Sequence, residues 1–179
     1  MTDAPDIGGE NVDEAEQLAV SSEVQANAWQ QTLDDMWALE ADLQDDGWET
    51  LVTAAGHTAS VTPSHGNGYW GLVHIVPDSD AETIGEAVEA GEFASYDVYR
   101  TDVDGRIFSV TVLMDPESET AVLVSNQFEL RKAHTLIRHT HEVGYVNSVF
   151  RYLDGTVVAQ VRHDDPEKFF PRYETFGDD

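Results

Sequence analysis

The sequence predicts an α+β domain in which three helices pack on a mainly antiparallel sheet of about seven strands. Some segments repeat their apolar residues with the period of an amphipathic helix, and others are short apolar runs typical of buried strands. Asp-Gly pairs at residues 104–105 and 154–155 each separate two such runs, which indicates two tight β-hairpins and antiparallel pairing. The expected order of elements is αββαβββαββ.

The N-terminal segment is expected to be a tail followed by a helix. Residues 1–21 hold many acids and few apolar side chains, so we expect a disordered acidic tail there and a single domain over residues 22–179. Ser22 and Gln25 have the spacing of a capping box that opens a helix. The apolar residues that form the inward face of this helix recur at intervals of three and four positions: Trp29, Leu33, Met36, Leu39 and Leu43.

Two strands and a helix are expected next, separated by a long loop. Residues 48–54 and the apolar run 70–76 are typical of strands. Residues 55–69 between them contain Gly, Pro and Ser, and a loop of this length is either a functional flap or a mobile connection. A second capping box then opens a helix over residues 79–91.

The C-terminal half is expected to hold two hairpins, a central strand and a third helix. The strands are residues 96–103, 106–114, 120–125, 146–153 and 156–163. The helix opens at Asn126 and runs to Gly144. Residues 165–167 form a short helical piece, which Phe169 and Phe170 dock on the body.

The first eight expected elements, in the order αββαβββα, resemble the roadblock and profilin-like folds in their order. This likeness concerns element order alone, because no residue motif accompanies it. It therefore carries no function with it.

The charge of the chain indicates the solvent in which it works. There are 35 acids against nine bases, a net charge of −26, and self-repulsion of this size strains a compact fold in dilute buffer. In molar salt the Debye length falls to about 3 Å, which screens the repulsion and indicates a halophilic cytoplasm. The alternative is an acidic protein of ordinary salinity, such as a nucleic-acid mimic, but here the acids are interleaved with an ordered apolar pattern.

Several classes of function are disfavoured by what the sequence lacks. It has no cysteine, which removes disulfides, thiolate catalysis and Cys-ligated zinc. No apolar run approaches the roughly 20 residues that span a bilayer, and the acidic N-terminus is unlike a signal peptide, so we expect a cytoplasmic protein without membrane contact. The common phosphate-loop, dinucleotide, zinc and hydrolase motifs are absent, so no cofactor is expected. The net charge disfavours a nucleic-acid partner.

The best candidate site lies on the third helix, in the less acidic part of the chain. Seven of the nine bases lie within residues 131–172, so this face is expected to bind a protein partner or a second copy of the chain. Helical spacing brings together side chains that, with the last hairpin, would hold a carboxylate or a phosphate: Arg131, His134, Arg138, His141, Arg162 and His163. The alternative is structural, because cations in the last turns of a helix stabilise its dipole and also partner the surplus acids.

The remaining histidines do not predict a metal site. His139 and His141 are two residues apart on a helix and point about 200° apart, so they cannot share one ion. His57 and His65 lie in the long loop, where solvation is the simpler interpretation. His74 lies within an apolar run, which favours a hydrogen-bonded histidine in the core.

Five short motifs resemble a known family. They are WQQTLDDM at residues 29–36, GWE at 47–49, GLV at 71–73, YDVYR at 96–100 and RHDDP at 162–166. With them, most of the chain after the tail resembles a family of small, acidic, uncharacterised haloarchaeal proteins. The family has no assigned activity, so the resemblance implies a halophilic origin and no functional residues.

Two functions from different classes follow. The leading interpretation is a non-catalytic binding or interaction module, because catalytic motifs are absent. The alternative is a small-anion-binding protein or enzyme that uses the third helix, with residues 55–69 as its flap.

Overall fold

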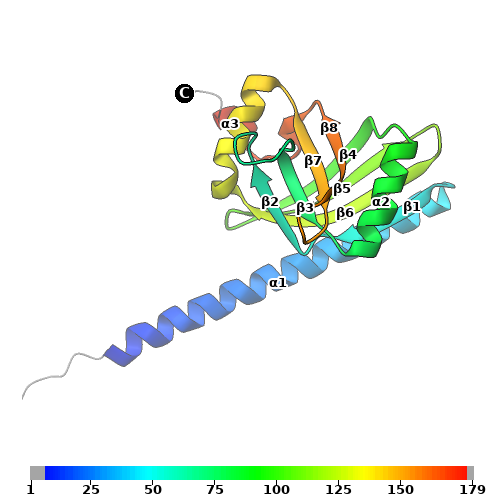
Figure 1. Ribbon diagram of the computed structural model, residues 1–179. Helices are drawn as coiled ribbons and strands as arrows, with labels where there is room; N and C mark the ends of the chain where they lie inside the picture. Colours follow the sequence, from blue (N-terminus) through cyan, green and yellow to red (C-terminus); the bar gives the residue numbers. More distant parts are fainter. Residues whose placement is uncertain (1–6, 177–179) are drawn as a thin grey trace, which may run out of the picture.

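The computed structural model describes residues 7–176, with side chains from residue 14 onward. Eight strands and three α-helices are connected by short loops and three 3₁₀ helices (Figure 1). In chain order they are α1 (Ile7–Asp45), β1 (Glu49–Ala54), β2 (His57–Val61), β3 (Gly71–Ile75), α2 (Asp78–Ala90), β4 (Ser95–Val103), β5 (Arg106–Asp115), β6 (Thr120–Glu129), η1 (Leu130–Ala133), α3 (His134–Val143), β7 (Val146–Arg151), β8 (Val157–His163), η2 (Pro166–Lys168) and η3 (Tyr173–Phe176).

The strands form two mixed sheets of four strands each, in the orders β1-β6-β5-β4 and β2-β3-β7-β8. The antiparallel pairs are β2–β3, β4–β5, β5–β6 and β7–β8, which include the two predicted hairpins, whereas β1 pairs parallel with β6 and β3 pairs parallel with β7. The α+β class with three helices is confirmed, and the one mainly antiparallel sheet of about seven strands is corrected to two mixed sheets with eight strands among the described residues. The two parallel pairings join segments far apart in the chain, and no local turn signal announces such a pairing.

The additional strand, β2, lies inside the predicted long loop. His57–Val61 pairs antiparallel with β3, and the hydroxyl of Thr58 lies 2.9 Å from Nδ1 of His74 on that neighbour. The sequence of β2, HTASV, is largely polar, so it lacks the clear alternation of apolar and polar residues that indicates a strand. The loop prediction is therefore wrong for these residues, and the element order on which the likeness to roadblock and profilin-like folds rested lacks one strand.

Helix α1 packs its C-terminal half on the outer face of the β1-β6-β5-β4 sheet. Met36 is buried there against the core residues Val110, Val112, Ala121 and Leu123. The N-terminal half of α1 projects away from the body (Figure 1), and residues 14–24 are exposed. The helix begins at Ile7, so the predicted start at Ser22 is wrong; residues 1–6 of the predicted tail lie outside the described residues.

The main core lies between the two sheets. Leu72 and Phe150 from one sheet meet Ile107 and Val122 from the other, and all four are almost fully buried. Helix α2 closes one side of this core by packing against β1 of one sheet and against β7 and β8 of the other. Its N-cap is Pro77 without a side-chain hydrogen bond, so the predicted capping box does not form.

Local turn chemistry was predicted well. Asp104 and Gly105 both have positive φ, 51° and 85°, as a type I′ hairpin turn requires. Gly144 ends α3 in the left-handed conformation, with φ 83°. The predicted start of this helix at Asn126 is wrong, because Asn126 lies inside β6 and bonds across strands to Ser109.

The C-terminal segment returns to the core as expected. Phe169 and Phe170 are buried, next to the short helix η2. The hydroxyl of Tyr96 donates to Asp165 Oδ2 at 3.1 Å and accepts from the Asp165 amide at 2.7 Å. These contacts hold the end of the chain beside β4, and from there η3 packs along α3.

Candidate ligand-binding groove

A groove of about 660 Å³ lies where several connections meet at the end of β6. Its floor and walls come from the β4–β5 turn, the ends of β5 and β6, η1, the start of α3 and η3, and Gln25 of α1 reaches its rim. The lining residues are Gln25, Asp104, Gly105, Arg106, Glu129, Leu130, Arg131, His134, Arg172, Thr175 and Phe176. Three arginines and a histidine thus surround a groove that holds two acids.

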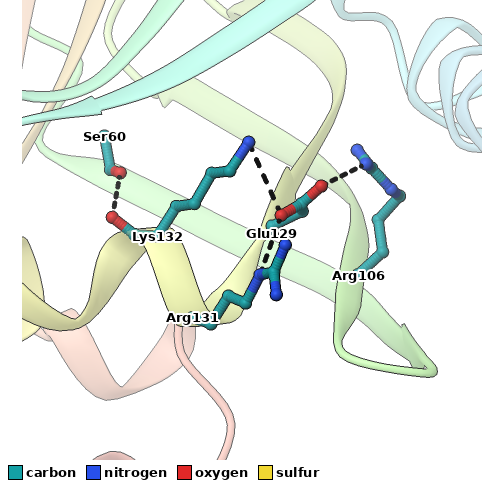
Figure 2. A network of polar contacts seen from close by, with 5 residues as sticks. All are labelled: Ser60, Arg106, Glu129, Arg131 and Lys132. Carbon is teal, nitrogen blue, oxygen red and sulfur yellow. Dashed lines mark hydrogen bonds and ion pairs between the residues drawn. The ribbon is translucent and has the colours of Figure 1, made fainter.

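One carboxylate, that of Glu129, is shared by three bases (Figure 2). Its Oε1 lies 3.0 Å from Nη2 of Arg106, while its Oε2 lies 3.3 Å from Nε of Arg131 and 3.6 Å from Nζ of Lys132. Partial burial alone would raise the pKa of Glu129, but the hydrogen bond from Arg131 and the three positive charges outweigh burial and lower the pKa below its ordinary value. One negative charge cannot neutralise three positive ones, so the cluster remains positive.

The position of these bases follows from sheet register and from a contact with the second sheet. Arg106 stands directly opposite Glu129 in the β5–β6 ladder. Arg131 and Lys132 follow on η1, which Ser60 of β2 anchors by donating a hydrogen bond of 3.0 Å to the Lys132 carbonyl (Figure 2). The positive cluster is therefore built by both sheets and is held in place by backbone.

The far wall of the groove belongs to the C-terminal segment. The ring of Phe176 lies 4.8 Å from the ring of His134. Arg172 has a positive φ of 54°, and its Nη2 lies 3.9 Å from Oδ2 of Asp102. At this length the ion pair leaves the guanidinium free to bind a better-placed oxyanion as well.

The structure does not bring the six residues predicted from sequence into one pocket. Arg131 and His134 line the groove, and Arg138 is exposed on α3. His141 stacks on Tyr173 with ring centroids 3.9 Å apart and lies 2.8 Å from the Tyr173 carbonyl, so its visible role is to hold η3. The other two residues lie on β8, where a one-residue step sends them to opposite faces of the sheet.

Arg162 and His163 show these two faces. Arg162 is on the outer face, over the ring of Tyr145 at 3.9 Å and 2.9 Å from Asp164. His163 is in the core, 0 % exposed, with Nε2 2.8 Å from the Ser148 hydroxyl. Burial lowers the pKa of His163 to about 4, which keeps its ring neutral.

His74 is the buried, hydrogen-bonded core histidine that the sequence predicted. It is 1 % exposed and is bonded to Thr58. Burial, and then the proximity of His163, lowers its pKa to about 3. Neither histidine therefore faces a ligand at the groove.

Sequence reasoning missed three residues of the groove: Arg106, Glu129 and Arg172. A signal existed for Arg106, because the Asp-Gly turn before it places it at the first position of a strand. Its pairing with Glu129 depends on the β5–β6 register, which was hidden because Glu129 was assigned to the third helix. Arg172 reaches the groove only because the chain end packs along α3.

The described part of the chain has neither a cluster of metal ligands nor a membrane-spanning helix. No group of three or more His, Asp or Glu side chains in it is arranged to hold a metal ion. None of its helices is both long enough and apolar enough to cross a membrane.

The described residues form an α+β protein, with two mixed four-stranded sheets around a common core and a base-lined groove where β6 meets α3. The chain belongs to a family of unknown function, DUF7529, whose sequence model matches residues 15–171. No curated protein and no solved structure matches significantly. The expectation of a family without an assigned activity is confirmed.

Proposed function

We propose that this protein is a non-catalytic interaction module of a halophilic cytoplasm, and that its groove binds an acidic segment of a partner protein. The observation that carries the proposal is the gathering of bases at the groove. A chain with nine bases and 35 acids places Arg106, Arg131 and Arg172 around one groove and adds Lys132 beside them. Pairing with scattered acids would not require this concentration.

The bases at the groove remain accessible although they share Glu129. The side chains of Arg131 and Lys132 are 81 % and 69 % exposed, respectively. A guanidinium binds a carboxylate through two parallel hydrogen bonds, so Arg131 can hold an incoming carboxylate while Glu129 stays with Arg106. In molar salt long-range attraction is screened, and such short-range bonds would carry the recognition.

The shape of the groove favours an extended segment over an enclosed small molecule. The alternative from the sequence required residues 55–69 to close over the bound anion, but none of them lines this groove. The groove is bounded by a turn, two helix ends and the chain end, and it stays open along its length. An acidic peptide would lie along it between Arg106 and Arg172.

The proposal is tested by binding of a fluorescently labelled hexaglutamate peptide in molar KCl, followed by anisotropy. Arg131→Gln removes one charge-assisted contact and is expected to weaken binding about tenfold, because such bonds contribute about 1.5–3 kcal/mol. Arg162→Gln is the matched control: Arg162 is also exposed and paired with an acid, but it lies outside the groove. Equal losses in both variants, or no binding by the unmodified protein, would contradict the proposal.

Association of the protein with itself is the second outcome to measure. The less acidic face, residues 131–172, contributes Arg131, His134 and Arg172 to the groove, and an acidic segment of a second copy would have the same chemistry as a foreign partner. Light scattering coupled to gel filtration in molar KCl distinguishes the two. A dimer that Arg131→Gln dissociates would identify the partner as a second copy.

A further inference from the structure

We propose that a second groove, around Arg151 on the outer face of the β2-β3-β7-β8 sheet, binds a small molecule through its carboxylate or phosphate group. The groove has a volume of about 540 Å³. It lies between the β2–β3 connection, which contributes residues 67–69, and the β7–β8 hairpin, which contributes residues 154–157. Arg151 and Gln160 project into it from β7 and β8.

The first observation is that Nε of Arg151 has no hydrogen-bond partner among the described residues. This nitrogen is also buried. The guanidinium of Arg151 likewise makes no ion pair within residues 7–176. Most of the other bases in the described part of the chain make ion pairs: Arg106, Arg131 and Lys132 with Glu129, Arg162 with Asp164, Lys168 with Asp97, and Arg172 with Asp102.

The second observation is that the backbone is shaped to place this side chain. The β7–β8 register shifts at Arg151: Phe150 faces Ala159, but Arg151 faces Val157. Such a bulge bends a strand and re-aims a side chain, and bulges are common beside functional sites. Gly155, with φ +98°, leaves room for the guanidinium, since a Cβ there would lie 3.3 Å from Nη1 of Arg151.

The neighbouring acid, Asp154, interacts with Arg151 only at longer range than an ion pair. One carboxylate oxygen of Asp154 accepts a hydrogen bond of 2.9 Å from the Thr156 amide, which closes the hairpin turn. The hydrogen bonds from Thr156, and more weakly the positive charge of Arg151, lower the pKa of Asp154, but the two side chains make no ion pair. The donors of Arg151 remain available to a ligand that enters the groove.

The chemistry of the ligand follows from these donors. The guanidinium offers Nε and Nη in one plane, a fork that matches the two oxygens of a carboxylate or a phosphate. A buried donor without an acceptor is costly, and an oxyanion would remove that cost. Asn67 and Tyr69 line the opposite wall and offer uncharged polar groups to the rest of a ligand. A groove of this volume suits a small molecule.

Part of the connection between β2 and β3 lies at the Arg151 groove. Residues 62–70 connect β2 to β3, and three of them line the Arg151 groove. Trp70 ties this connection to β8, because its amide donates to Gln160 Oε1 at 3.4 Å. Ligand binding is expected to order residues 67–69 further.

The test is an NMR titration of the full chain in molar KCl with inorganic phosphate and, separately, with succinate. We expect at least one probe to shift the Arg151 Nε–Hε signal and the amides of residues 67–69. Arg151→Gln is expected to weaken binding at least tenfold. Arg162→Gln on the adjacent strand, also on the outer face but paired with Asp164, is expected to have no effect.

Several results would overturn the proposal. They are no shift with either probe, shifts that persist in Arg151→Gln, or equal losses in Arg162→Gln. If Arg151→Gln fails to fold, Arg151→Lys keeps the charge but loses the planar fork, so undiminished binding by that variant would also count against it. Hexaglutamate binding at the Arg131 groove is measured separately, so the two proposals can fail independently.

Discussion

Buried histidines show how single residues set the chemistry of the interior. One ring nitrogen of His74 is hydrogen-bonded to the hydroxyl of Thr58, and one ring nitrogen of His163 is hydrogen-bonded to the hydroxyl of Ser148. Their other nitrogens, Nε2 of His74 and Nδ1 of His163, are buried without a described partner. Burial is the main reason that both pKa values fall, to about 3 for His74 and about 4 for His163. The core therefore requires both rings to be neutral.

Acid is expected to destabilise the protein through these two rings. Their ordinary pKa is 6.5, so below that pH the unfolded chain binds protons that the folded protein excludes. The stability that the neutral rings contribute is fully present above about pH 6.5 and falls by about 1.4 kcal/mol per pH unit for each ring as the pH decreases. Denaturant unfolding in molar KCl between about pH 7.5 and pH 5.5 measures this slope.

The control for the unfolding experiment is His57→Gln. Because His57 is exposed on β2, this substitution should leave the pH dependence of the free energy of unfolding unchanged. Ring nitrogen shifts in NMR give an independent readout, and His74 and His163 should both remain neutral at about pH 5.5. Titration of either ring near its ordinary pKa would contradict the assignment.

At the scale of elements, helix α1 shows what periodicity predicts and what it misses. The stripe from Leu33 to Leu43 packs on the sheet as expected, because an amphipathic repeat needs only one apolar surface to bury it. Strand β2 was missed because its residues are polar, and they lie in the sheet only because β3 pairs with them. Glu129 was placed in a helix, whereas continued pairing with β5 keeps it in β6.

Two adjacent residues of α1 give a matched test of its packing. Met36 is 2 % exposed against the sheet, and Trp37 is 49 % exposed on the other face. Met36→Ala is expected to lower the free energy of unfolding by about 2–5 kcal/mol, because it leaves a cavity. Trp37→Ala is expected to change it by about 0.5 kcal/mol or less. If thermal unfolding showed a larger loss of stability for Trp37→Ala than for Met36→Ala, this packing would be contradicted.

At the scale of the molecule, the excess of acids is the main electrostatic feature. A net charge of −26 on 179 residues repels itself at low ionic strength, and no described ion pair relieves more than a local part of it. Seven of the nine bases lie within residues 131–172, and this segment supplies Arg131 and Arg172 to the first groove and Arg151 to the second. Charge distribution, more than shape, separates these surfaces from the rest.

Stability is expected to rise steeply with salt. Between about 0.1 M and 1 M salt the Debye length falls from about 10 Å to about 3 Å, which removes most of the repulsion among surface acids. The melting temperature, followed by circular dichroism, should therefore increase across that range of KCl. A melting temperature that is independent of salt would contradict the halophilic interpretation.

The projecting half of α1 is expected to be dispensable for folding. Residues 14–24 are exposed, and the packing on the sheet involves Leu33 and later residues. A chain that begins at residue 22 should melt within a few degrees of the full chain. One that begins at residue 40 loses Met36 and should be strongly destabilised. Equal destabilisation by both truncations would show that the domain does not begin near residue 22.

By itself the sequence determined the α+β class, the positions of the hairpin turns, the core face of α1, the burial of His74 and the excess of acids. These properties are local or additive, so they can be read from neighbouring residues or from composition. Only the tertiary structure decided that there are two sheets, that Arg106 meets Glu129, and that Nε of Arg151 is buried without a hydrogen bond among the described residues. The two sheets depend on the parallel pairings of β1 with β6 and of β3 with β7, which join segments far apart in the chain. The other two depend on the exact register of neighbouring strands, of β5 with β6 and of β7 with β8, which the apolar pattern does not specify.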